Sequence, residues 1–217
     1  MIVGERKPFD EIKESIKDYK KILILGCGTC VSVCMAGGEK EVELLASQLR
    51  IADNLEGKEL KISEATVQRQ CDREYIEPII AMTKDCDAII SMACGAGVQM
   101  LAEMIEALPV IPATNTRFIG VTEAEGIWSE RCRSCGDCKL GSYGGICPVT
   151  ICAKGLLNGP CGGASLGKCE AGNNKDCAWE LIYQRLKQQG RLDNLKTFVM
   201  PLDYRLQAHP VHLVKEC

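Results

Sequence analysis

The chain has 217 residues, and its 26 basic and 29 acidic side chains give a formal charge of −3 at pH 7. This near balance provides no general electrostatic footprint for nucleic acid or for an anionic membrane, so neither is an expected partner. No run approaches the roughly 18 apolar residues of a membrane span. Residues 1–20 carry charges throughout and lack the apolar segment of a signal peptide, which favours a cytoplasmic location.

Fifteen cysteines are the most unusual feature of the composition. In a reducing cytosol, thiols bind metal more readily than they form disulfides. The odd count also argues against a closed set of disulfides and leaves Cys217 as the expected spare cysteine. The composition therefore indicates a metalloprotein.

Helix and strand patterns alternate through residues 1–115. Apolar residues at helical spacing predict helices at 5–20, 39–50, 75–82 and 97–108. Short apolar runs predict strands at 21–25, 58–63, 87–91 and 109–112. Strand followed by helix, repeated, is typical of a parallel sheet with right-handed crossovers. We therefore expect residues 1–115 to form a small α/β domain with a Rossmann-like parallel sheet.

Five cysteines of this domain follow its predicted strands: Cys27, Cys30, Cys34, Cys71 and Cys94. Because the loops after successive parallel strands emerge at one carboxyl edge, these thiols should converge there. We expect four of the five to hold an iron–sulfur cluster, with Cys30, Cys34, Cys71 and Cys94 as the first choice and Cys27 as the alternative ligand. Cys86 precedes its strand, so it should lie at the opposite edge as a buried thiol.

Plain packing and dinucleotide binding are the competing interpretations of this edge. Gly26-x-Gly28 begins like a dinucleotide-binding loop, but Val31 stands where the third glycine belongs. A cofactor phosphate at this loop would also leave the thiols unexplained. The cysteines therefore favour the cluster.

Residues 116–217 are expected to form a second, loop-dominated iron–sulfur domain. Residues 116–131 carry apolar side chains without a clear period, and we interpret them as a short docking segment between the two halves. Residues 177–189 predict a helix, with Asp176 as its cap and Gly190 just past its end.

Residues 132–177 contain eight cysteines and ten glycines but only seven Leu, Ile or Val side chains. Apolar burial this small cannot offset the entropy of ordering the backbone, so metal should hold the segment. The eight cysteines are Cys132, Cys135, Cys138, Cys147, Cys152, Cys161, Cys169 and Cys177.

The first cysteines of this segment have ferredoxin-like spacing. Cys132-x2-Cys135-x2-Cys138 followed by Cys147-Pro148 resembles a [4Fe–4S] loop, although eight residues precede Cys147 where the bacterial ferredoxin run has roughly three. Structural zinc is the alternative, because C-x2-C also suits a four-cysteine knuckle. Eight thiolates could hold two clusters, one cluster plus zinc, or one cluster beside free cysteines. Counting the edge site, we expect two [4Fe–4S] clusters in the chain, with zinc as the alternative metal.

The sequence offers little acid–base machinery. His209 and His212 lie in a tail-like stretch, residues 203–217, and we assign them no metal. The acidic pairs are interpreted as solvated loop charges: Asp85 with Asp87, and Glu123 with Glu125. No Ser–His–Asp arrangement, P-loop or H-E-x-x-H motif is present. Many thiols with few acid–base groups suit a protein that carries electrons better than one that makes bonds.

Several stretches within residues 20–200 resemble a known family. They are ILILGCGTCVSVCMAGGEKEVELLASQL, RQCD, SMACGAGVQ, CPVTICAKGLLNGPCGGASLGKCE, CAWELIYQRL and GRL. The most specific piece is KGLLNGPCGG followed by GKCE. These stretches resemble the iron–sulfur partner subunit of bacterial, acetogen-type methylenetetrahydrofolate reductases, and the second half is similar to the cysteine-rich methylenetetrahydrofolate reductase C-terminal domain.

The resemblance implies a place in one-carbon metabolism, in the Wood–Ljungdahl pathway. In that family a separate flavin-bearing barrel subunit binds the folate and performs the hydride chemistry, while the partner subunit supplies clusters and a docking surface. A βα barrel needs about 250 residues, so this chain should not reduce folate by itself. The resemblance therefore implies a non-catalytic redox subunit of an oxidoreductase complex, which passes electrons to or from that flavin and uses an external electron carrier or redox protein.

Two other functions fit the same residues. The chain could be a scaffold, held together by zinc or an inert cluster, that recruits the catalytic subunit. It could also be a redox sensor in which loss of an exposed cluster reshapes the partner surface. Iron, sulfide and zinc analysis separates most of these possibilities.

Overall fold

The computed structural model describes residues 1–172 and 174–214. The chain divides into two compact units, Met1–Trp128 and Ser129–Cys217. Cys217, the expected spare cysteine, lies outside the described residues. Within these ranges, no helix is both long enough and apolar enough to cross a membrane.

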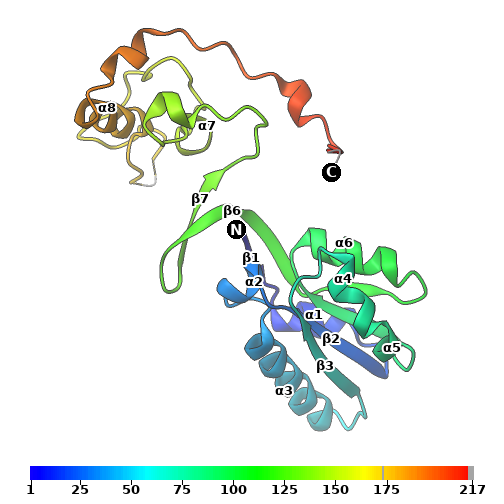
Figure 1. Ribbon diagram of the computed structural model, residues 1–217. Coiled ribbons are helices and arrows are strands. Elements are labelled where there is room, and N and C mark those ends of the chain that lie inside the picture. Colours follow the sequence, from blue (N-terminus) through cyan, green and yellow to red (C-terminus); the bar gives the residue numbers. More distant parts are fainter. Residues whose placement is uncertain (173, 215–217) are drawn as a thin grey trace. The chain divides into compact units, whose positions relative to one another are not determined.

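The first unit is built on a four-stranded parallel sheet in the order β3-β2-β4-β5 (Figure 1). Its strands are β2 (Lys21–Cys27), β3 (Lys61–Val67), β4 (Ala88–Met92) and β5 (Val110–Pro112). Leu23 of β2 lies opposite Ser63 of β3 on one side and Ile89 of β4 on the other. The expected α/β class with a small parallel sheet is confirmed.

Helical segments connect and cover these strands. They are α1 (Phe9–Ser15), α2 (Cys30–Val33), α3 (Glu39–Leu55), α4 (Arg73–Ile76), η1 (Glu77–Ile79), α5 (Ile80–Thr83) and α6 (Gly95–Met104). The helix predicted at 75–82 is broken into α4, η1 and α5. Pro78 lies in the 3₁₀ turn, where a residue without an N–H interrupts the helical hydrogen bonds.

Alternate residues of β2 contribute to two separate apolar cores, because successive side chains of a strand point to opposite faces. Ile22 and Ile24 pack with residues of α1 and α3. Leu23 and Leu25 pack with residues of α4 and α6. Helices therefore cover both faces of the sheet. The last residue of β2 lies at the carboxyl edge of the sheet.

The first residues form a strand, not the beginning of the helix predicted at 5–20. β1 (Ile2–Arg6) pairs antiparallel with β6 (Thr114–Ala124), and α1 begins only after Pro8. The prediction was wrong at its start because the partner strand is remote in the sequence and leaves no local signal.

Residues 116–131, expected as a docking segment, belong to a β-hairpin. β6 turns into β7 (Ile127–Cys132), and the three strands form a second sheet in the order β1-β6-β7. Gly126 has a φ of 77° at the turn, which glycine adopts without strain. The structure shows that β6 pairs with β1, and the expected docking role of these residues stays a prediction. The two units accordingly divide between residues 128 and 129, whereas the sequence suggested 115 and 116.

The second unit consists mainly of loops around one longer helix, α8 (Ala178–Gln188), which confirms the helix predicted there. Its N-cap is Cys177. Asp176, the expected cap, is instead ion-paired with Lys168 at 2.6 Å. Gly190 has a φ of 66° just past the helix, as predicted. The shorter elements are η2 (Leu140–Tyr143), α7 (Pro148–Ile151), η3 (Leu192–Lys196) and η4 (Tyr204–Gln207).

The apolar core of the second unit is small. Its buried members are Tyr143, Cys177, Trp179, Ile182 and Leu186. Three of them belong to α8, so the loops that carry the cysteines contribute little apolar burial of their own. This small core agrees with the prediction that apolar packing alone does not order residues 132–177.

Candidate functional site

The carboxyl edge of the parallel sheet brings three cysteines together. Cys27 ends β2, Cys71 follows β3, and Cys94 follows β4 as the N-cap of α6. The pKa of the Cys71 thiol is raised, first by burial and then by the neighbouring thiols of Cys94 and Cys27. Cys71 is therefore within electrostatic range of both partners.

Cys30 and Cys34 form a second pair on the short helix α2. Cys34 is buried, and its thiol donates a hydrogen bond to the carbonyl of Ile2 at 3.7 Å. Burial is the main cause that raises the pKa of Cys34, and the Cys30 thiol adds to it. Cys34 also shares an apolar cluster with Cys27 and Cys94. The Cys34 thiol hydrogen-bonds to Ile2 of β1, whereas the cysteines that raise the pKa of Cys71 are Cys94 and, less strongly, Cys27.

Gln70, which the sequence did not single out, is a buried side chain that positions the loop of Cys71 at this edge. Its side chain is fully buried, and its amide donates to the carbonyl of Leu25 at 2.8 Å. The hydroxyl of Ser91 donates to the Gln70 side-chain oxygen at 2.6 Å. One side chain thus ties the ends of β2 and β4 to the loop that carries Cys71. A polar residue just after a predicted strand gives no periodic signal, so the sequence alone could not reveal this role.

Cys86 lies just before β4, as the sequence predicted, but it is partly exposed and not buried, so that part of the prediction was wrong. Its thiol donates to the carbonyl of Met82 at 3.5 Å. Burial raises the pKa of Cys86, and the carboxylates of Asp85 and Asp87 raise it further. Asp87 is more than a solvated loop charge, since it accepts hydrogen bonds from the amides of Lys20 and Lys21.

In the second unit, two cysteine sulfurs accept backbone hydrogen bonds from the residue two positions later. The amide of Ser134 donates to the Cys132 sulfur at 3.3 Å, and the amide of Gly163 donates to the Cys161 sulfur at 3.5 Å. Both loops contain a left-handed residue, with φ of 48° at Ser134 and 80° at Gly162. Amides aimed at sulfur stabilise the thiolate form that binds metal.

Cys161 also belongs to a charged cluster with Lys154 and Glu170. Its thiol donates to a Glu170 carboxylate oxygen at 3.5 Å, and the same carboxylate is ion-paired with Lys154. These contacts lower the pKa of Glu170, with the hydrogen bond from Lys154 as the largest cause and that from Cys161 next.

The remaining cysteines of the second unit are distributed over several environments. Cys152 packs against the same apolar core that contains Cys177. Cys147 is the N-cap of α7, and the Cys135 thiol donates to the carbonyl of Asp137 at 3.7 Å. Cys138 is exposed and Cys169 is partly buried.

Across residues 1–172 and 174–214, no three cysteine, histidine or acidic side chains are arranged to hold a metal ion. The donor chemistry nevertheless fits iron–sulfur or zinc, because the candidate ligands are thiols on glycine-containing loops and two sulfurs already accept amide hydrogen bonds. The ligand assignments therefore stay predictions.

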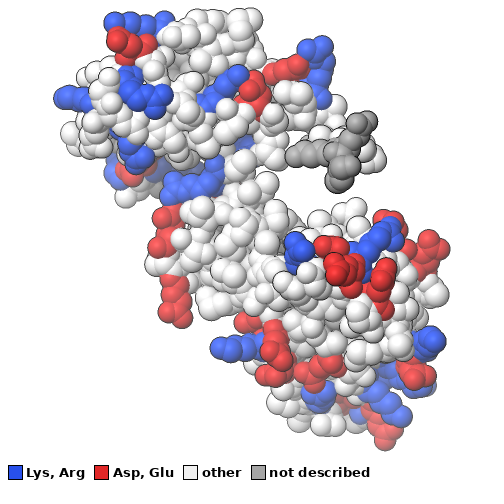
Figure 2. Space-filling model, in the orientation of Figure 1, with Lys and Arg blue, Asp and Glu red and all other residues white. Residues whose placement is uncertain are grey.

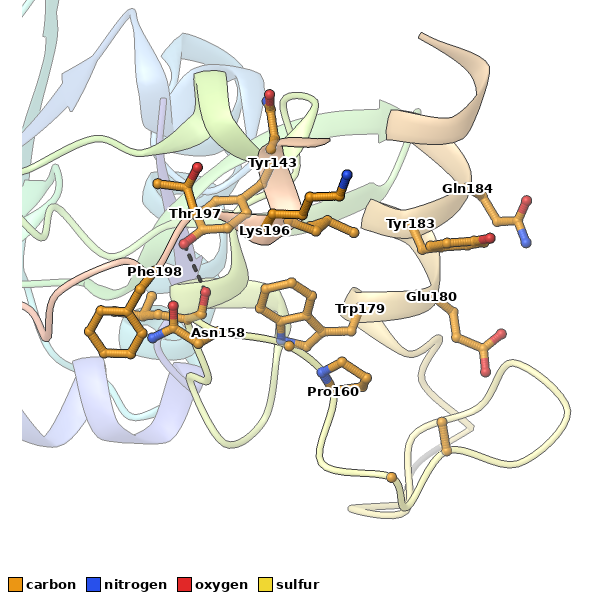
Figure 3. Close-up of a pocket in the computed structure, with 16 residues that line it drawn as sticks. Tyr143, Asn158, Pro160, Trp179, Glu180, Tyr183, Gln184, Lys196, Thr197 and Phe198 are labelled. Carbon is orange, nitrogen blue, oxygen red and sulfur yellow. Dashed lines mark hydrogen bonds between the residues drawn. The ribbon is translucent and has the colours of Figure 1, made fainter. Parts of the chain in front are cut away.

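A pocket of ≈ 740 Å³ lies wholly within the second unit (Figure 3). It is formed by α8, by residues 157–164 and by residues 194–198. Its aromatic lining residues are Tyr143, Trp179, Tyr183 and Phe198. The sequence predicted only the helix at 177–189 and not the pocket, because segments distant in sequence build the rest of it.

Charged side chains are mixed on the surface. On the face shown in Figure 2, acidic and basic residues are interspersed on both units. That face therefore presents no broad cationic surface, in agreement with the formal charge of −3.

Residues 111–205 match the family model described as "Methylene-tetrahydrofolate reductase C terminal". The match supports a relation of this part of the chain to methylenetetrahydrofolate reductases. The matched residues include the eight cysteines of residues 132–177 and the residues that line the pocket. A comparison of the chain with curated proteins gave no match.

Proposed function

We propose, from the match of residues 111–205 to a methylenetetrahydrofolate reductase C-terminal family, that the chain is the iron–sulfur electron-transfer subunit of such a reductase. Its partner would be a flavin-containing catalytic subunit that reduces the methylene group on tetrahydrofolate to methyl. The observation that carries the proposal is that the matched segment holds eight cysteines, two of whose sulfurs accept amide hydrogen bonds. An external electron carrier or redox protein would complete the electron path.

Two groups of residues would hold the clusters. In the first unit they are drawn from Cys27, Cys30, Cys34, Cys71 and Cys94. In the second unit they are drawn from Cys132, Cys135, Cys138, Cys147, Cys152, Cys161, Cys169 and Cys177. When bound, [4Fe–4S] clusters supply one-electron exchange without proton chemistry at a side chain.

The protein residues around the thiols would set how readily the metal is held. The amides of Ser134 and Gly163 stabilise negative charge on two sulfurs, and Lys154 contributes a cation near Cys161. At the first unit, Gln70 fixes the loop of Cys71 relative to β2 and β4. In the first unit, these Gln70 contacts keep a proposed ligand, Cys71, next to an ordered part of the sheet, which favours a defined site over loose thiol binding.

Metal analysis of the anaerobically purified chain is the first test. Two [4Fe–4S] clusters require about eight iron and about eight sulfide ions per chain. We expect Cys94→Ser and Cys161→Ser each to lose roughly half of the iron. Cys86→Ser is the matched control, because Cys86 precedes β4 and belongs to neither group, and the iron content of this variant should equal that of the wild type. Zinc without sulfide would overturn the electron-transfer proposal and favour the scaffold.

Flavin reduction in the reconstituted complex is the second test. The intact chain and the two cluster-deficient variants are each bound to the flavin subunit, and binding is verified for each. We expect electron exchange between the flavin and an external carrier to be slowed or lost in the variants and retained in Cys86→Ser. Unchanged exchange through a complex with demonstrably reduced iron would contradict an electron-transfer role and leave a scaffold or sensor.

A further inference from the structure

The aromatic pocket of the second unit has a rigid base. The indole N–H of Trp179 donates to the carbonyl of Leu156 at 3.1 Å, and the hydroxyl of Tyr143 donates to the carbonyl of Leu157 at 2.9 Å. The two rings meet edge to face, with centroids 5.7 Å apart and planes at 82°. Both side chains are buried. Because their polar atoms are already paired, these rings are fixed in place before any ligand arrives.

A side-chain clamp holds the opposite wall. The amide nitrogen of Asn158 donates to the carbonyl of Val199 at 2.8 Å, and the amide of Val199 donates to the Asn158 oxygen at 2.7 Å. This pair fixes residues 194–198 against residues 157–164. In Figure 3 the rings of Tyr143 and Trp179 lie in the middle of the view, with Tyr183 on one side and Phe198 on the other.

Two of the aromatic side chains remain available to a ligand. Tyr183 is 44% exposed and Phe198 is 70% exposed, although both line the pocket. Apolar rings left in contact with water gain free energy when a flat partner covers them. The volume of ≈ 740 Å³ lies within the usual range of small-molecule sites, about 300–1,000 Å³.

The charges at the pocket favour an uncharged ligand. Glu180 and Lys196 are the charged residues among the lining side chains that the structure describes. Lys196 is ion-paired with Asp193 at 2.6 Å, so the pocket provides no cluster of cations for a phosphate. Gln184 and Thr197 offer hydrogen-bonding groups at the lining, which suit ring heteroatoms.

We propose that this pocket binds a small molecule with a neutral, planar, heteroaromatic system of two or three fused rings. Stacking on the exposed rings of Tyr183 and Phe198 supplies the affinity, and polar lining groups select the heteroatoms. The site goes beyond electron transfer by the cysteine clusters, because the proposed contacts to the ligand come from side chains of the pocket and not from a metal.

Equilibrium dialysis with riboflavin, a neutral three-ring heteroaromatic compound, tests the proposal on the full chain. We expect saturable binding of one riboflavin per chain. Removing an aromatic side chain on which a ligand stacks typically lowers the affinity roughly 5- to 100-fold. Tyr183→Ala and Phe198→Ala should therefore each weaken riboflavin binding by at least about 5-fold. Circular dichroism of each variant verifies that the fold is retained.

Tyr204→Ala is the matched control. Tyr204 is also 70% exposed and lies in the same unit, but it does not line the pocket, so its removal should leave the affinity unchanged. Absence of saturable binding, or equal affinities in the pocket variants and Tyr204→Ala, would overturn the proposal. Dialysis uses the chain as purified anaerobically, with its metal content unchanged, because the pocket includes residues of the 132–177 segment. A failure of binding in such folded protein is distinguishable from a failure of the proposed electron-transfer function, which flavin reduction in the complex measures.

Discussion

The buried side-chain amide of Gln70 donates a hydrogen bond to the main-chain carbonyl of Leu25 at 2.8 Å. The Gln70 oxygen in turn accepts a hydrogen bond from the hydroxyl of Ser91, which lies opposite Leu25 in the neighbouring strand. A fully buried polar group is tolerated because both of its functional groups are paired. The contact makes the loop before Cys71 part of the core of the sheet.

Gln70→Leu should therefore destabilise the first unit. The substitution removes both hydrogen bonds and leaves buried polar partners behind, at a cost of about 1–3 kcal/mol. Urea unfolding followed by circular dichroism measures the change. Gln99→Leu is the control, because the Gln99 amide makes an exposed bond to the carbonyl of Gly95, and its effect should stay within about 0.5 kcal/mol. Equal effects of the two substitutions would contradict the role of Gln70.

Gly37→Ala should disrupt the first unit more severely. A Cβ at this position would lie 1.8 Å from the carbonyl oxygen of Met92, and a backbone atom cannot move away cheaply. The Gly37 carbonyl also accepts a hydrogen bond from the amide of Cys27 at 2.8 Å, which holds the loop after α2 against the end of β2. We expect a loss of more than about 3 kcal/mol, or failure to fold, measured by thermal unfolding.

Gly95→Ala is the matched control for Gly37→Ala. Its added Cβ would have the Thr116 hydroxyl oxygen as its nearest neighbour, at an ordinary 3.6 Å. Alanine is also a better helix former than glycine at the start of α6, so the variant should be as stable as the wild type or more stable. A destabilised Gly95→Ala together with a stable Gly37→Ala would refute the steric explanation.

Asp87→Asn should change how stability depends on pH. The Asp87 carboxylate accepts hydrogen bonds from the amides of Lys20 and Lys21 at 3.0 and 2.9 Å, and these bonds are the main cause that lowers its pKa. A lowered folded-state pKa contributes stability that is present above the ordinary value of about 3.9 and is lost as the pH falls through the folded-state pKa.

The urea midpoints of wild type and Asp87→Asn should accordingly differ near pH 6 and converge as the pH falls below about 4. Asp85→Asn serves as the comparison, because Asp85 is an exposed carboxylate two residues away. It should leave the pH profile of the wild type unchanged. A difference between wild type and Asp87→Asn that stays constant from pH 6 to pH 3 would exclude this linkage.

Removal of metal should make the second unit sensitive to protease before the first. The first unit has apolar cores on both faces of its sheet, whereas the cysteine loops of the second add little to the core around α8. Order that depends on metal is lost with the metal. Anaerobic chelation followed by limited trypsin digestion and mass spectrometry should place the first cleavages within residues 132–177. Cleavage of both units at equal rates, with or without chelator, would count against metal-dependent order.

Local patterns in the sequence were sufficient to predict the parallel sheet and its main helices. Residues 22–25 are apolar and buried in β2, and α3 and α8 show their apolar faces at helical spacing. The same reasoning placed Cys27, Cys71 and Cys94 after strands, and the structure brings these three together. Such features follow from a residue's neighbours in the chain, so the sequence carries them directly.

Only the tertiary structure decided the features that join distant segments. β1 pairs with β6 across the whole first unit, Gln70 bonds to Leu25 within the core, and the aromatic pocket is assembled from α8 and two loops. Hydrogen bonding and apolar burial between remote segments leave no periodic pattern in either one. Local patterns in the sequence thus indicated the strands of the parallel sheet, the longer helices and the cysteine loops. Long-range packing determined which segments meet and also which residues form β1, because pairing with a remote strand leaves no local signal.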